Sequence, residues 1–79
     1  MRFDFYVKKE YIIEFDGEQH FKPIETFGGE ERFKRTQEVA QIKNNYCLQH
    51  GIPIIRIPYW KRGKIELNDL LPQYSQFLI

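Results

Sequence analysis

The sequence predicts one small α/β domain with the element order β-β-α-β-α. Two early stretches, 3–7 and 11–16, have strand-like patterns, an amphipathic stretch covers 30–50, and a short apolar run follows at 52–57. Alternating polarity is typical of a half-buried strand. A strand, a helix and a further strand in this order favour a crossover unit. The 79 residues allow a single domain, 1–79, with a modest core.

The two early strands are expected to pair as an antiparallel hairpin. Residues 3–7 alternate in polarity, and residues 11–16 are rich in β-branched and aromatic side chains. The link 8–10 contains no Gly or Asn, so it does not fix the turn type. Pairing across this link places Val7 opposite Tyr11, Phe5 opposite Ile13 and Asp4 opposite Glu14. The apolar face of the hairpin is expected to consist of Phe3, Phe5, Ile13 and Phe15.

A loop over 17–29 and then a long helix are expected after the hairpin. The helix is predicted from Glu30 to about His50, because acids suit its first turn and Gly51 is a typical stop signal. Its apolar stripe is predicted at Val39, Ile42, Tyr46 and Gln49, with Phe33 on a neighbouring line.

The last part of the chain is expected to contain a buried strand and a closing helix. The run 52–57 is almost unbroken in its apolar character, as in a strand buried on both faces. The basic stretch 61–64 indicates a turn. Apolar residues over 65–78 then predict a second helix, which is broken or bent at Pro72.

Composition restricts the classes of protein that the chain can belong to. A net charge of +1 is too balanced to indicate nucleic-acid binding by itself. Cys47 is the single cysteine, which excludes an internal disulfide and fits a reducing cytoplasm. No apolar run approaches the roughly 18 residues of a membrane span, and the charged start does not have the pattern of a signal peptide.

Three carboxylates are predicted to converge on one face of the hairpin. Asp4 and Glu14 would lie about 5 Å apart, and Asp16 projects from the same face as Glu14. Like charges across a strand pair are destabilising, and a hard cation such as Mg²⁺ would compensate them. The alternative is a solvated face on which Arg2 neutralises the acids, and the residues alone leave both interpretations open.

His20 follows Asp16 by four positions, just beyond Gly17. A histidine can act as a general acid or base near neutral pH, or it can orient a water molecule. The alternative is an ordinary polar loop residue. Proximity to the acids favours the catalytic interpretation.

The segments Arg2-Phe3-Asp4-Phe5 and Ile13-Glu14-Phe15-Asp16-Gly17-Glu18-Gln19-His20 resemble the PD-(D/E)XK nuclease superfamily. The stretches 36–47 and 51–59 resemble the same branch, which contains very-short-patch-repair endonucleases and phage homing endonucleases. The resemblance covers roughly residues 2 to 60, and each piece alone would be weak.

This resemblance implies a minimal restriction-endonuclease-like fold and Mg²⁺-dependent (or Mn²⁺-dependent) hydrolysis of phosphodiester bonds in DNA. Asp4 and Asp16 would hold the metal, with the Phe15 carbonyl and Glu14 assisting, and His20 would help to activate the attacking water. The catalytic set is therefore Asp4, Glu14, Asp16 and His20. The implied location is the cytoplasm of a bacterial or phage-infected host cell.

Two features depart from the family pattern. The branch usually has an acidic residue eleven positions before the glycine that precedes the last strand, and that position is Ala40 here. The acid would orient the histidine, so the resemblance implies weak or no cleavage. The neighbours Thr36 and Lys43 lie one turn either side of Ala40 and are expected to line the site. The superfamily's first helix and first strand are also missing, as in a version truncated at its amino terminus.

Several surface residues have two interpretations. Lys22, Lys34, Arg35 and Lys43, with Arg32, can neutralise DNA phosphates or form an ordinary mixed-charge surface. Tyr59 and Trp60 can stack on a base or close a small core.

Three functions follow: an active DNA endonuclease, an impaired nuclease domain that still binds metal or DNA, or a non-enzymatic interaction module. The limited core also suggests a homodimer.

Overall fold

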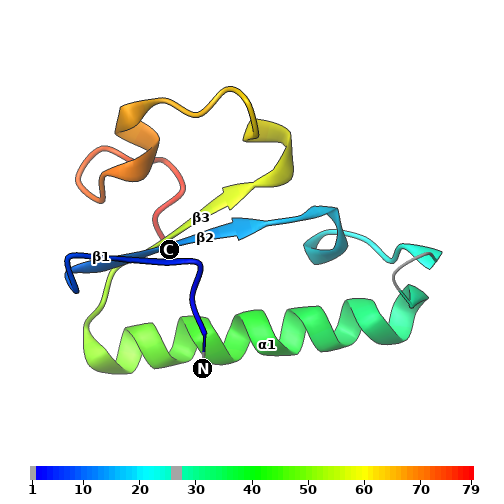
Figure 1. Cartoon of the computed structure of the whole chain (residues 1–79). Helices are drawn as coiled ribbons and strands as arrows, with labels where there is room; N and C mark the ends of the chain where they lie inside the picture. The colour runs from blue at the N-terminus through cyan, green and yellow to red at the C-terminus, as the bar shows by residue number, and fades with distance from the viewer. Residues whose placement is uncertain (1, 26–27) are drawn as a thin grey trace.

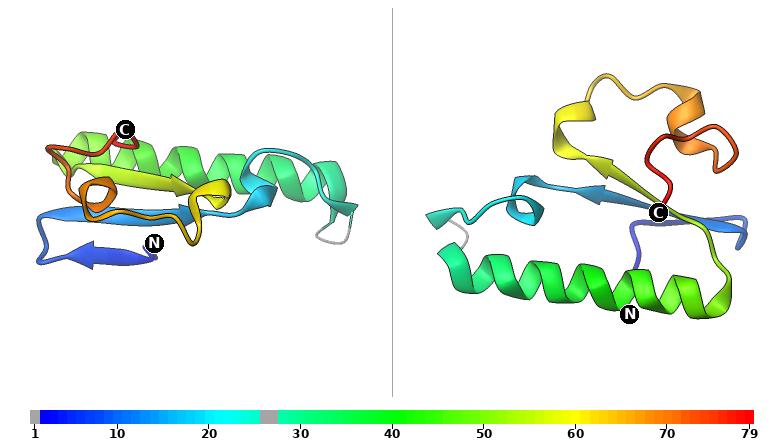
Figure 2. Two further views of the ribbon diagram at one scale, coloured as in Figure 1. Left: turned by 90° about the horizontal axis from the view of Figure 1, so that it is seen from above. Right: turned by 180° about the vertical axis from the view of Figure 1, so that it is seen from behind.

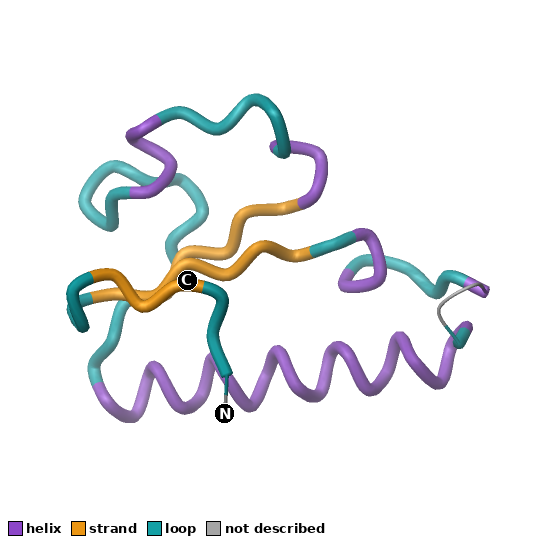
Figure 3. Tube along the Cα trace, in the orientation of Figure 1, coloured by secondary structure: helices purple, strands orange, loops and turns teal. Residues whose placement is uncertain are grey.

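The computed structural model describes residues 2–25 and 28–79 and contains one sheet and one long helix (Figures 1 and 3). The sheet order is β1-β2-β3. Helix α1 runs along one face of this sheet, and the C-terminal segment lies over the other face, as Figures 1 and 2 show. The predicted order β-β-α-β is therefore confirmed. Its elements are β1 (Phe5–Val7), β2 (Tyr11–Asp16), α1 (Gly29–His50) and β3 (Ile54–Pro58).

The hairpin has the register that the sequence predicts. Phe5 pairs with Ile13, and Val7 pairs with Tyr11. The turn is tight, and the Glu10 N–H donates to the Val7 carbonyl at 2.8 Å. Its central residues, at positions 8 and 9, have φ angles of 49° and 58°. Left-handed backbone at both central positions is the geometry of a type I′ turn, which normally selects Asn or Gly.

Phe3 does not share a face with Phe5, contrary to the prediction. Strand β1 begins only at Phe5, so the alternation does not extend back to position 3. The Phe3 ring instead packs on the α1 side, in the cluster that contains Ile12 and Cys47. Its centroid lies 6.0 Å from that of Tyr46.

Strands β2 and β3 are parallel, and the register places Glu14 beside Arg56. Ile12 of β2 packs with Cys47 of α1, whereas Ile13 belongs to a second cluster on the opposite face. All residues of β3 are buried, which confirms the prediction of a strand covered on both faces. The strand begins at Ile54, two residues later than expected.

Helix α1 has the predicted bounds to within one residue at its start. It ends at Gly51, which has φ 66°, a conformation that glycine adopts without steric cost. The Ile52 N–H closes the end by donating to the Cys47 carbonyl at 2.8 Å. The loop predicted over 17–29 contains the short 3-10 helix η1 (Glu18–His20), and its positions 26 and 27 lie outside the described residues.

The predicted apolar stripe of α1 is wrong. Val39, Ile42 and Tyr46 are 37%, 56% and 38% exposed, while Cys47 is buried. The sheet face that α1 covers is charged at Glu14 and Arg56, which Lys43 and Asn44 of the helix contact. It is apolar at Ile12 and Ile54, which pack with Cys47. Gln49 is also exposed, and Phe33 is half-buried.

The predicted closing helix over 65–78 is also wrong. The segment contains only the 3-10 helix η4 (Leu67–Leu70) and turns. It returns to β3, where the Arg56 N–H donates to the Phe77 carbonyl at 3.1 Å and the Ile79 N–H donates to the Ile54 carbonyl at 2.9 Å. Pro72 cannot donate within a helix. Of the residues that predicted the helix, Ile65 and Leu70 pack with Phe77 over the outer face of the sheet. Others of that set are exposed, namely Leu67, Tyr74 and Leu78.

Candidate functional site

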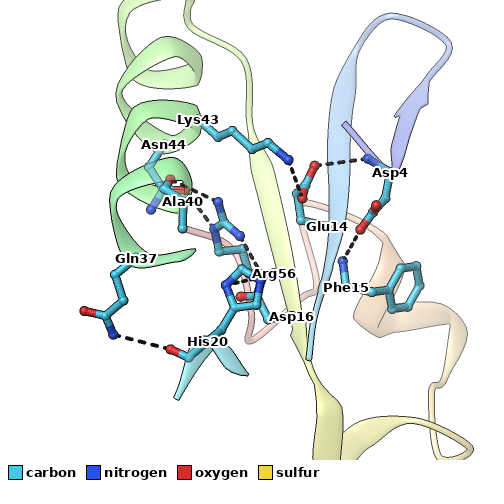
Figure 4. Close-up of polar contacts among 10 residues, drawn as sticks. All are labelled: Asp4, Glu14, Phe15, Asp16, His20, Gln37, Ala40, Lys43, Asn44 and Arg56. Atoms are coloured by element: carbon cyan, nitrogen blue, oxygen red, sulfur yellow. Dashed lines mark hydrogen bonds and ion pairs between the residues drawn. The ribbon is translucent and has the colours of Figure 1, made fainter. Parts of the chain in front are cut away.

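The side chains of Glu14 and Arg56 project from the sheet toward α1, where they contact Lys43 and Asn44 (Figure 4). A hollow of about 400 Å³ opens between β2, η1 and α1. A smaller hollow of about 260 Å³ shares His20, Ala40 and Arg56 with it and adds Asp16 and Gln37. The charged and titratable residues that line the larger hollow are Asp4, Glu14, His20, Arg32, Arg35, Lys43 and Arg56.

Asp4 and Glu14 lie together, as the hairpin predicted. The Asp4 N–H donates to Glu14 Oε1 at 3.0 Å, and the Phe15 N–H donates to Asp4 Oδ2 at 2.7 Å. Glu14 is only 5% exposed, whereas Asp4 is exposed. The Lys43 ammonium lies 3.3 Å from Glu14 Oε2, so a lysine of α1 compensates the buried carboxylate.

Asp16 belongs to a separate buried ion pair. Arg56 Nη1 donates to Asp16 Oδ1 at 2.7 Å, and both side chains are more than 90% buried. The guanidinium also donates to Asn44 Oδ1 at 2.8 Å and to the Ala40 carbonyl at 3.1 Å. Arg56 therefore joins β2, β3 and α1. Asp16 lines the smaller hollow and Asp4 lines the larger one.

The role of Arg56 could have been found from the sequence. It is the one charged residue within the apolar run 52–57. A charge in a strand buried on both faces needs an ionised partner, because an unpaired buried charge is very costly. The acids of β2 were the available partners. The interpretation of a solvated face neutralised by Arg2 is wrong, because Glu14 and Asp16 are buried and pair with Lys43 and Arg56.

His20 lies beside Asp16, as its spacing suggested. Its Nδ1 atom is 3.6 Å from Asp16 Oδ1. The carbonyl of His20 accepts a hydrogen bond from Gln37 Nε2 at 3.4 Å, which connects η1 to α1. A carboxylate next to one ring nitrogen can orient the imidazole and leave the other nitrogen for a ligand.

Ala40 lines both hollows, together with His20 and Arg56. Its neighbours Thr36 and Lys43 line the larger hollow as well. A methyl group at position 40 contributes no donor or acceptor. Position 40, midway along the side of α1 that faces the hollows, therefore has no side-chain group that could bind a ligand or transfer a proton.

The basic residues proposed for phosphate contact have different positions. Arg35 and Lys43 line the larger hollow, and Lys34 is exposed on α1. Lys22 lies 2.7 Å from Glu18, and this hydrogen bond raises the pKa of the Lys22 ammonium. Much of the charge of Lys22 is thus matched locally.

Oxygen donors suited to Mg²⁺ are present in the larger hollow, since Asp4 and Glu14 both line it. Among residues 2–25 and 28–79, no three acidic, histidine or cysteine side chains are already grouped as for a metal ion. A cation shared by Asp4 and Glu14 would have to displace the Lys43 ammonium from Glu14. Asp16 would join the same cation only if it left Arg56.

The fold and the site together define a small α/β domain with a hollow between sheet and helix that is lined by both acidic and basic side chains. The chain matches no family model, no curated protein and no solved structure. In the part of the chain that the structure describes, no helix has the length and hydropathy needed to cross a membrane.

Proposed function

We propose that this chain is a nuclease-like domain that binds a divalent cation and the phosphodiester backbone of DNA in the larger hollow. The observation that carries the proposal is that this hollow combines the carboxylates of Asp4 and Glu14 with His20 and several cationic side chains. Carboxylates favour a hard metal ion, and cations favour phosphate. Few ligands other than a metal-bound phosphate ester need both.

Asp4 and Glu14 would hold the cation, with the Phe15 carbonyl as a further oxygen donor. When bound, Mg²⁺ or Mn²⁺ supplies polarisation of the phosphate and lowers the pKa of a coordinated water. Lys43, displaced from Glu14, would then pair with a phosphate oxygen. Arg35 would anchor the DNA backbone from α1.

His20 would exchange a proton with the attacking water, and Asp16 would orient its ring. Asp16 therefore acts on His20 and not on the metal, because its carboxylate is already paired with Arg56 at 2.7 Å. This assignment differs from the one that the family resemblance implies, in which Asp16 is a metal ligand. Asp16→Asn also leaves Arg56 without its ionised partner, so it is assayed under conditions in which circular dichroism shows the variant to be folded. There it should weaken catalysis and leave cation binding unchanged.

Cleavage by this chain is expected to be weak, because position 40 lacks an acid. A carboxylate at position 40 would face His20 and Arg56 across the two hollows. Ala40→Asp should therefore raise plasmid nicking in Mn²⁺ or Mg²⁺, by roughly the 10²- to 10⁴-fold associated with general acid–base catalysis. Ala40→Asn is the matched control, since it has the same shape without the charge.

Two results would separate the proposal from its alternatives. Calorimetric titration with Mn²⁺ should give saturable heat for the native chain and none for Asp4→Asn. Absence of that heat would remove the nuclease interpretation. A folded Ala40→Asp variant that nicks no faster than Ala40→Asn would remove the account of the helix position.

The second candidate is a non-enzymatic interaction module, such as a homodimer. The observation that favours it is the exposed apolar stripe of α1, which includes Val39, Ile42 and Tyr46. Sedimentation over a range of protein concentrations tests this candidate. It predicts a dimer that is lost in Ile42→Glu, with metal binding absent.

A further inference from the structure

Three aromatic rings gather at the carboxyl ends of β2 and β3, next to the site. Phe21 follows η1, and Tyr59 and Trp60 lie in η3 (Tyr59–Lys61) directly after β3. The Phe21 centroid lies 4.9 Å from that of Trp60 and 5.7 Å from that of Tyr59. Tyr59 and Trp60 are in edge-to-face contact at 5.3 Å. These three residues are called the aromatic cluster below.

The aromatic cluster does not close a core. Phe21, Tyr59 and Trp60 are 44%, 37% and 57% exposed. Exposed aromatic surface that is grouped in one place is typical of a binding site, whereas isolated exposed apolar residues are ordinary. The interpretation of Tyr59 and Trp60 as core-closing residues is therefore not supported.

A hollow of about 380 Å³ adjoins the aromatic cluster. Phe21, Trp60 and Phe77 provide its apolar wall, and the buried Arg56–Asp16 ion pair provides its polar side. Arg56 also lines the two hollows described above, and Phe21 lines the 260 Å³ one. The aromatic cluster and the carboxylates of the site thus belong to one continuous surface.

Three basic residues, at positions 61, 62 and 64, follow the aromatic cluster directly in the sequence. Lys61 is matched by Asp69 at 3.4 Å, while Arg62 and Lys64 are exposed. Exposed rings beside cationic side chains are the combination that single-stranded nucleic acids select, because bases stack on the rings while phosphates follow the cations. In a duplex the faces of the bases are already stacked on one another.

We propose that the aromatic cluster is a stacking site for an unpaired nucleobase. The phosphates of the same strand would pass Arg62 and Lys64 on one side and approach the larger hollow on the other. This inference rests on the proposed function, because the strand is taken to run from the aromatic cluster to a cleavage site in the larger hollow. It narrows the substrate class to DNA that is single-stranded or locally unpaired, whereas the stacking itself requires no metal.

Trp60 is the single tryptophan of the chain, so its fluorescence reports directly on the aromatic cluster. An unlabelled oligothymidylate is titrated into the full chain in EDTA. A duplex of equal length and an oligomer of abasic sites are titrated separately in the same way. The single strand is expected to quench Trp60 and to bind most tightly. The abasic oligomer keeps the phosphates and should bind without quenching.

Variants then test which side chains bind the base. Anisotropy of a labelled oligothymidylate is expected to show roughly 5- to 150-fold weaker binding for Phe21→Ala and Trp60→Ala, the loss that corresponds to one base–aromatic stack. Trp60→Phe should retain most of the affinity, because it keeps an aromatic face. Tyr74→Ala is the matched control, since Tyr74 is an aromatic residue that is 65% exposed outside the aromatic cluster.

Equal affinities for the single strand, the duplex and the abasic oligomer would overturn the proposal. So would Phe21→Ala and Trp60→Ala variants that remain folded by circular dichroism and bind as Tyr74→Ala does. Quenching in EDTA together with no heat in the Mn²⁺ titration would leave the stacking site standing and remove the nuclease function. Metal-dependent nicking without any base-dependent quenching would support the nuclease function and remove the stacking site.

Discussion

Replacement of Arg56 by methionine should destabilise this fold more than any surface change. The guanidinium is 9% exposed, and it holds Asp16, Asn44 and the Ala40 carbonyl through three hydrogen bonds. Methionine keeps much of the aliphatic volume but leaves the Asp16 carboxylate buried without its partner. The energetic cost therefore comes mainly from the stranded charge.

The magnitude follows from the burial of the pair. Removing one member of a buried ion pair costs about 3–5 kcal/mol. A domain of 79 residues has a total stability of roughly 4–12 kcal/mol. For this size, the loss corresponds to a fall in Tm of roughly 18–30 °C. Arg56→Met should accordingly lose between about a quarter and all of the stability of the fold.

Urea unfolding followed by circular dichroism measures this effect, and the double variant Arg56→Met/Asp16→Leu provides the comparison. Replacing both members of a buried pair by apolar residues is often neutral or stabilising, so the double variant should recover most of the lost stability. A loss below about 1 kcal/mol for Arg56→Met, the value for an exposed pair, would refute the reasoning. A double variant no more stable than the single one would refute it too.

The remaining predictions concern the hairpin turn, the short helix η4 and the buried thiol of Cys47. Lys9→Gly should stabilise the hairpin by about 1 kcal/mol in urea unfolding, because glycine relieves the left-handed strain at φ 58°; an unchanged midpoint would contradict this. The Glu66 N–H, and secondarily Lys61, lower the pKa of Asp69 below 3.8. The stability that Asp69 contributes is therefore present above that value and is lost as the pH falls through the lower folded pKa. The free energy of unfolding of Asp69→Asn should accordingly depend less on pH below about pH 4 than that of the native chain. Equal pH profiles for both chains would count against this. Burial raises the pKa of the Cys47 thiol above 9.0, so a thiol reagent at pH 8 should label Cys47 only in urea. Rapid labelling of the folded chain would show that the core between α1 and the sheet opens without global unfolding.

Local patterns in the sequence were enough for the hairpin, the long helix and the buried strand. A period of two fixes which strand residues share a face, and a glycine with left-handed backbone ends a helix wherever that helix packs. The turn over 8–10 could not be assigned because its lysines adopt a conformation that their type disfavours. In the site, the hairpin register brought Asp4 to Glu14, and spacing along the chain brought His20 to Asp16.

The charge of Arg56 within an apolar run indicates that it needs an acidic partner, but which acid each cation neutralises was decided only by tertiary structure. Lys43 and Arg56 lie 29 and 40 residues from the carboxylates that they neutralise, and no local pattern expresses such distances. The side of α1 that faces the sheet was decided in the same way. A helix normally buries its most apolar stripe. Here the sheet presents the buried Glu14 carboxylate, which Lys43 of α1 neutralises, and the Arg56 guanidinium, which Asn44 of α1 contacts. Turning Val39, Ile42 and Tyr46 inward would leave Glu14 buried without its cation, and an unpaired buried charge is very costly.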